Sequence, residues 1–171
     1  MSKSRFYDVI SGAMYHISSC EFQFEDGPFS TDLFSLGKND FEINALFTYI
    51  NNPEEVSPKV FFKFGMDRNK LFGLIIVKDN GFLVRVDTNI VMPDSDLARS
   101  KVSIDDVISH YNSKAKVGGF VAVSRDRNHM YYMLDADPAP AALMDPSKMH
   151  AFLVNVLFSA FTIVKPDIFN N

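Results

Sequence analysis

The chain has 171 residues, 47% hydrophobic and 22% charged, a balance typical of a globular protein and not of a disordered or fibrous one. Its net charge of −4 argues against a general nucleic-acid-binding protein, because phosphate contacts need clustered Lys and Arg. Cys20 is the only cysteine, which excludes an internal disulfide and fits a reducing cytoplasm.

No stretch of the sequence predicts a membrane segment. The first residues lack the apolar core of a signal peptide. The longest apolar stretch, residues 151–164, is shorter than the roughly 20 residues that span a bilayer, and polar residues interrupt it. We therefore expect a cytoplasmic protein with no membrane partner and a single domain over residues 1–171.

Residues 1–38 predict an N-terminal helix and an extension ahead of the body, residues 39–171. The helix is expected over residues 4–18, where apolar side chains recur at helical spacing: Phe6, Val9, Ile10, Ala13, Met14 and Ile17. Residues 20–24 alternate like a short strand. Phe29 and Phe34 follow in a turn-rich stretch that is too apolar for a free loop, so we expect it to pack across the body.

A second helix is predicted to begin at Asn39. Asn39 and Glu42 have the spacing of a capping box, with Asn in the place of Ser or Thr. Apolar residues follow at helical spacing: Ile43, Leu46, Phe47 and Ile50. Pro53 ends the pattern.

Three consecutive strands are predicted over residues 59–88. Asn80-Gly81 predicts a two-residue type I′ turn, which would pair Val77 with Val84 and Ile75 with Val86. One face of this hairpin is then wholly apolar: Ile75, Val77, Phe82, Val84 and Val86. The strand 71–77 is apolar on both faces and should be central, and its Gly73 indicates a bulge or a close backbone approach.

The other face of these strands is mixed and supplies candidate binding residues. Apolar side chains alternate there with Lys78, Arg85 and Asp87. Phe61, Phe29 and Phe34 are not accounted for by the core and could form an apolar patch for a partner. The candidate protein-binding residues are Phe29, Phe34, Phe61, Lys63, Leu83 and Arg85.

The second half of the body predicts two helices around a hairpin. After a surface connection, Ser103 is expected to cap a helix, and residues 120–124 and 129–135 to form two strands. Asp145 and Pro146 start a final helix that runs to about residue 164. Its polar residues form one narrow stripe, so the helix is buried in a core or an interface: Asn155, Ser159 and Thr162.

These elements predict an α+β protein with a mainly antiparallel sheet, because the strands come in hairpin runs and do not alternate with helices. The sheet is expected to combine a three-strand meander with a hairpin, packed by helices. The predicted order is α-(β)-α-βββ-α-ββ-α.

Few residues suggest chemistry. Asp135 and Asp137 follow a strand and could hold a divalent ion, although a polar strand end before Pro138 is the simpler interpretation. His16 and Cys20 are four residues apart, but two ligands do not make a zinc site. No hydrolase, zinc-protease, dinucleotide or P-loop motif is present. We therefore expect no catalytic, cofactor-binding or metal-binding residue and no enzymatic activity.

The element order, in a small acidic chain, resembles that of the class I type III secretion chaperones and the related YbjN-like proteins. The resemblance covers roughly residues 39–171 and is one of topology and composition, since no motif of that family is matched residue for residue. It implies a cytoplasmic homodimer whose sheet and helix surfaces hold an extended segment of a secreted protein.

The leading hypothesis is therefore a non-catalytic protein-binding module, chaperone- or adaptor-like, that holds a partner through apolar and sheet-edge contacts. One alternative is an inhibitor or immunity-type protein, phage- or plasmid-encoded, that blocks a folded host or toxin protein. A third is a small enzyme or ligand-binding domain that uses Asp135, Asp137 and His129 at a pocket mouth.

Overall fold

The computed structural model describes residues 2–19, 22–23, 35–36, 41–46, 59–64, 71–123 and 127–164. Its α-helices are α1 (Ser2–Ser19), α2 (Asp94–Arg99), α3 (Ile104–Lys114) and α4 (Pro146–Phe161), with short 3₁₀ turns η4 (Ala141–Met144) and η5 (Thr162–Val164). Its strands are β1 (Phe22–Gln23), β2 (Ser35–Leu36), β3 (Phe41–Leu46), β4 (Lys59–Phe64), β5 (Leu71–Val77), β6 (Phe82–Asp87), β7 (Gly119–Val123) and β8 (His129–Ala136).

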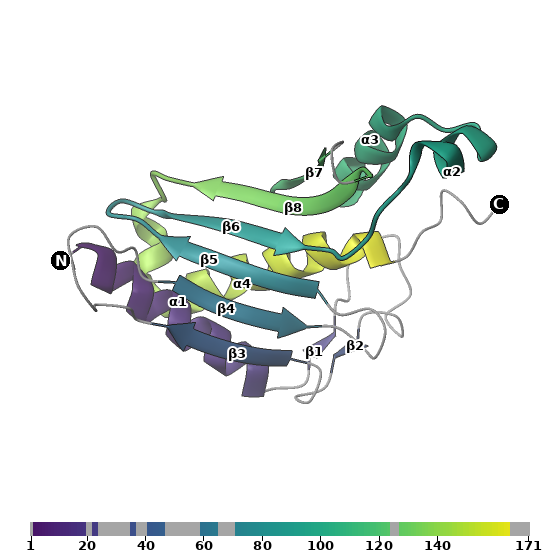
Figure 1. The fold of residues 1–171 in the computed structure, drawn as a ribbon. Helices are drawn as coiled ribbons and strands as arrows, with labels where there is room; N and C mark the ends of the chain where they lie inside the picture. The colour runs from purple at the N-terminus through teal and green to yellow at the C-terminus, as the bar shows by residue number, and fades with distance from the viewer. Residues whose placement is uncertain are drawn as a thin grey trace.

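Six of the described strands form one antiparallel sheet in the order β3-β4-β5-β6-β8-β7 (Figure 1). The meander β4-β5-β6 is its centre, with the hairpin β7-β8 added beside β6 and β3 added beside β4. The short strands β1 and β2 pair separately. The predicted α+β class, with a mainly antiparallel sheet, is confirmed, and β5 is central as expected.

The helices pack on one face of the sheet only. In Figure 1, α1 and α4 lie side by side behind the strands. α3 joins the same side, since Tyr111 contacts Phe120 of β7 at 5.9 Å and Phe120 contacts Tyr132 of β8 at 5.5 Å between ring centroids. The face turned to the viewer carries no helix among the described residues.

An aromatic core fills the space between the helices and the sheet. Phe64 of β4 contacts Phe161 of α4, with ring centroids 5.8 Å apart. Phe82 of β6 contacts Phe6 of α1 and Phe152 of α4 at 6.4 and 6.0 Å. The abundance of Phe is thus largely a packing feature, since each of these pairs adds ring contacts to ordinary apolar burial.

The predicted helix beginning at Asn39 is wrong, because residues 41–46 form strand β3. The segment Phe-Glu-Ile-Asn-Ala-Leu also alternates with a period of two, and its aromatic and β-branched residues favour a strand. β3 pairs in antiparallel register with all of β4, from Phe41 opposite Phe64 to Leu46 opposite Lys59. Pairing with the edge of β4, which would otherwise lack a partner strand, outweighed the helical spacing of the apolar residues in this segment.

The turn between β5 and β6 differs from the predicted type I′ turn. Val77 pairs with Phe82 and Ile75 with Val84, and the Lys78 amide donates to the Gly81 carbonyl at 2.8 Å. None of residues 79–81 has a positive φ, which a type I′ turn requires. The pairing is displaced by two residues from the predicted one, so the alternation is kept and the five predicted apolar residues all face the helices.

The helix starts of the second half are confirmed. The Ser103 hydroxyl accepts from the Asp106 amide at 3.1 Å, as expected for the N-cap of α3. α4 begins at Pro146 behind the N-cap Asp145. The connection before α3 contains the short helix α2, which was not predicted. Asn128 ties this connection to the β7-β8 hairpin by donating to the Met92 carbonyl at 2.8 Å.

The cap of α4 predicts an acid-sensitive contribution to stability. Asp145 Oδ1 accepts from the hydroxyl and the amide of Ser147, each at 2.9 Å, and these bonds lower the pKa of Asp145. Because the pKa of Asp145 is lower in the folded than in the unfolded state, its ionised carboxylate stabilises the folded protein. This contribution is complete above the ordinary Asp pKa of about 3.9 and is lost as pH falls through the pKa of the folded state.

We expect Asp145→Asn, which keeps an acceptor without a charge, to be less stable than the native protein at neutral pH. The difference should shrink in urea titrations as pH falls below about 4 and through the lowered pKa of the native Asp145, where its carboxylate takes up a proton. An equal difference at both pH values would contradict this role of the carboxylate.

Candidate binding face

The outward side of the sheet is the most distinctive surface of the described structure. We call it the open face, and it consists of Phe61, Lys63, Phe72, Leu74, Ile76, Leu83, Arg85, Asp87, Val121, His129, Tyr131, Met133 and Asp135. Exposed fractions are 36% for Phe61, 49% for Phe72, 45% for Val121 and 42% for Met133. Large apolar side chains are therefore half in water on four different strands.

The strand register places these side chains in rows across the sheet. One row runs through Lys63, Phe72, Asp87, Tyr131 and Val121. The next row runs through Phe61, Leu74, Arg85 and Met133. Side chains directly opposite on paired strands lie about 4.5–5.5 Å apart at Cβ, so each row is a continuous strip of contacts. The apolar residues of neighbouring strands therefore lie near one another, with Asp87 and Arg85 of β6 between those of β5 and those of β8.

A cluster of aromatic and charged groups lies at one end of the open face. The Tyr131 ring stacks on His129 with centroids 4.6 Å apart, and the Arg85 guanidinium lies 4.9 Å from the Tyr131 ring centroid. His129 Nε2 is 2.5 Å from Asp87 Oδ1. These contacts fix the orientation of Tyr131 and Arg85, which lowers the entropy that a partner would otherwise have to remove on binding.

Four of the six predicted binding residues share the open face. Phe61 and Lys63 come from β4, and Leu83 and Arg85 come from β6. Phe29 and Phe34 lie outside the described residues. Sequence reasoning missed Phe72, Met133 and Val121, although the alternation that exposes Phe61 identifies them once the neighbouring strands are known.

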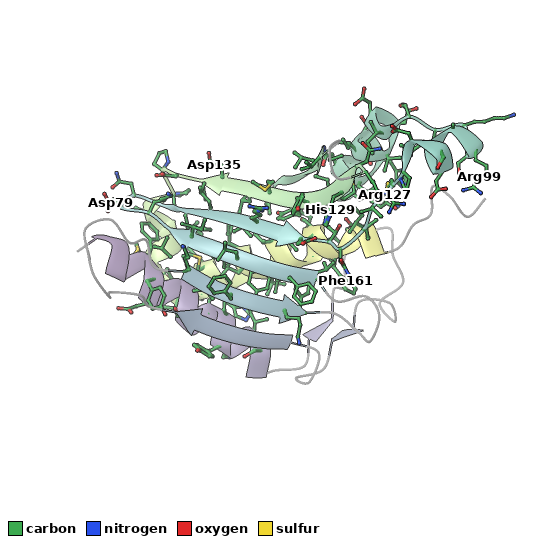
Figure 2. All side chains as sticks on the ribbon, viewed as in Figure 1. Asp79, Arg99, Arg127, His129, Asp135 and Phe161 are labelled. Atoms are coloured by element: carbon green, nitrogen blue, oxygen red, sulfur yellow. The ribbon has the colours of Figure 1, made fainter. Side chains whose placement is uncertain are left out.

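The residues of the enzyme alternative do not converge. Asp135 Oδ1 accepts from the Asp137 amide at 3.1 Å, so this pair forms a local turn at the end of β8. His129 begins β8, and Asp135 lies six positions further along the strand, about 20 Å away. Figure 2 shows the two at opposite ends of the strand. Within the described chain, no three His, Cys, Asp or Glu side chains lie close enough to share an ion.

One pairing was invisible in the sequence. His16 of α1 and His150 of α4 are 134 positions apart, yet their ring centroids lie 5.0 Å apart at an interplanar angle of 70°. The predicted partner of His16, Cys20, lies outside the described residues. Only the packing of α1 against α4 brings the two histidines together, so residue spacing along the chain carries no signal for them.

The fold and the open face define the class: an α+β protein whose six-stranded antiparallel sheet is covered on one side by the described helices. The chain matches no protein-family model, no curated protein and no solved structure at a significant level. The resemblance to the type III secretion chaperones therefore stays a prediction. Among the described helices, none combines the length and the apolar character needed to cross a bilayer.

Proposed function

We propose that this protein is a non-catalytic protein-binding module of the cytoplasm, chaperone- or adaptor-like, and that the open face is its binding surface. The observation that carries the proposal is the half-exposure of Phe61, Phe72, Val121 and Met133 on the sheet face that no described helix covers. Half-exposed apolar side chains on several neighbouring strands, with the charged residues Asp87 and Arg85 among them, are typical of a protein interaction site.

The chemistry of the face favours an extended apolar protein segment as the partner. Lys63 and Arg85 lie among Asp87 and Asp135, so the surface lacks the uniform positive charge that nucleic acid needs. Side chains in parallel rows suit a strand-like ligand, whose alternate residues project towards the sheet. The outermost strands β3 and β7 offer backbone groups for additional pairing with such a segment.

A homodimer is part of the proposal. The resemblance to the secretion chaperones implies it. Light scattering of the purified chain is expected to give twice the monomer mass. A monomeric mass at all accessible concentrations would contradict the homodimer. It would not bear on the open face as the surface for a different partner.

The binding surface is tested by a matched pair of aromatic residues. Phe72 on the open face and Tyr15 on α1 are each 49% exposed, so both can be replaced without opening the core. A photo-crosslinking residue at each position would identify the partner in host cells. With that partner purified, Phe72→Glu is expected to weaken binding by about 30-fold or more, because it places a charge in an apolar contact.

Tyr15→Glu serves as the control and should bind like the native protein. Equal affinity in the two variants would overturn the open face as the binding surface. Conversion of a dimer to a monomer by Phe72→Glu would assign the face to self-association instead. A crosslink to one folded protein, lost only in Phe72→Glu, would favour the inhibitor alternative over a chaperone.

A further inference from the structure

Arg85 is a cation on an inner strand of the open face, with apolar side chains on both sides of it. The strand register places Leu74 of β5 and Met133 of β8 directly opposite Arg85. Arg85 is exposed, so its guanidinium is accessible to a partner. When a partner covers apolar neighbours of this kind, water leaves the charged group as well, and an ion pair formed there is stronger than one in open solvent.

The guanidinium of Arg85 is positioned by an aromatic ring. It lies 4.9 Å from the centroid of Tyr131. The Tyr131 ring is itself stacked on His129, with centroids 4.6 Å apart and ring planes at 13°. The attraction between cation and ring restricts the motion of the guanidinium, whereas its N–H donors still need an acceptor. Arg85 therefore has less side-chain entropy to lose when a partner binds.

The two aspartates that share the open face with Arg85 are bonded to other groups. Asp87 Oδ1 accepts from the Asn89 amide at 2.8 Å and also contacts a histidine of β8. Asp135 Oδ1 accepts from the Asp137 amide at 3.1 Å. Within the described part of the chain, no ion pair joins Arg85 to either aspartate. The guanidinium thus offers both its charge and its donors to a carboxylate from outside.

We propose that the protein segment held on the open face carries an Asp or Glu side chain that pairs with Arg85, with apolar residues before and after it. This inference rests on the proposed function and adds the chemistry of the partner. An extended segment turns alternate side chains towards the sheet, so its apolar residues would meet Leu74 and Met133 on either side of the ion pair. The guanidinium can donate to both oxygens of a carboxylate at once, which favours an acid over the corresponding amide.

The test begins with a phage library of random dodecapeptides, selected against the native protein and against Phe72→Glu. Peptides that bind the native protein and not Phe72→Glu are ligands of the open face, and we expect Asp or Glu at one fixed position between their apolar residues. Fluorescence anisotropy with a synthetic peptide of the enriched sequence should then show at least about tenfold weaker binding to Arg85→Gln. Replacing the acidic residue of the peptide by its amide should weaken binding to the native protein equally, and should have no further effect on Arg85→Gln.

Arg99→Gln is the matched control, because it removes the same charge from α2, which Figure 2 shows beyond the end of the sheet. It should bind the peptide like the native protein. Arg85 is exposed, so Arg85→Gln is expected to fold, which circular dichroism verifies.

Two kinds of failure are distinguishable. The inference is overturned, with the proposed function intact, if the peptides that depend on Phe72 show no acidic preference or bind Arg85→Gln as tightly as the native protein. An equal loss of affinity in Arg99→Gln would also overturn it, since net charge alone would then explain the effect. If no selected peptide depends on Phe72, the open face fails as a surface for extended segments, and the inference fails with it.

Discussion

Replacing Gly81 by alanine is expected to lower the free energy of unfolding by about 1–3 kcal/mol, the range found when extra carbon is forced into a well-packed site. A Cβ at position 81 would lie 2.1 Å from the Ala136 carbonyl oxygen and 2.7 Å from Asp137 Cα. Both are backbone atoms, and the Ala139 amide, which donates to the Asn80 carbonyl at 2.8 Å, holds this segment against the turn. The strand end must therefore move.

The matched control is Gly12→Ala. Gly12 lies inside α1, and a Cβ there would meet no atom within 4 Å. Alanine should stabilise the protein by about 0.5–1 kcal/mol, because it reduces the freedom of the unfolded chain and favours the helix. Chemical denaturation of the two variants measures both effects. A loss of stability in Gly12→Ala, or none in Gly81→Ala, would contradict the packing described for these glycines.

Replacing Ser159 by alanine is expected to destabilise the protein by about 1–3 kcal/mol, the cost of leaving buried polar groups without partners. The fully buried Ser159 hydroxyl accepts from the amides of Lys116 and Val117 at 2.8 and 3.2 Å. The Val117 carbonyl in turn accepts from Tyr132 at 2.7 Å, and burial raises the pKa of this tyrosine. The connection between α3 and β7 thus depends on one hydroxyl of α4.

Ser113→Ala is the comparison for Ser159. The Ser113 hydroxyl is exposed and donates to the His110 carbonyl at 2.6 Å, where water can replace it. Its removal should change the free energy of unfolding by no more than about 0.5 kcal/mol. Thermal and urea unfolding of both variants give the measurement. Equal effects at the two positions would mean that the amides of Lys116 and Val117 find other partners when the hydroxyl is absent.

Local patterns predicted most of the fold because they depend on neighbouring residues only. The alternation of Ile75, Val77, Phe82, Val84 and Val86 predicted the buried face correctly even though the turn register was wrong. A displacement of two residues preserves which side of a strand each residue occupies, so the face was less sensitive to error than the pairing. The Asp145-Pro146 start of α4 was predictable for the same local reason.

What could not be predicted depends on contacts across the fold. β3 was mistaken for a helix because its partner β4 is not visible in the local pattern. Ser159 and Thr162 were recognised as a polar stripe, but both are fully buried. Thr162 donates to the Ser159 carbonyl three residues earlier, whereas the bonds of Ser159 to the amides of Lys116 and Val117 need the position of α3. The open face was anticipated in part, since Phe61 and Arg85 were identified while Phe72 was not.

Because the described helices cover one face of the sheet, different residues serve folding and form the exposed surface. Inward residues such as Val60, Ile75 and Val84 determine whether the chain folds, because they alone meet the helices. Outward residues such as Phe72 and Met133 contribute little to that core. Mutation can therefore alter the outward set with small effects on folding, and the surface proposed to bind a partner can change without passing through unstable intermediates.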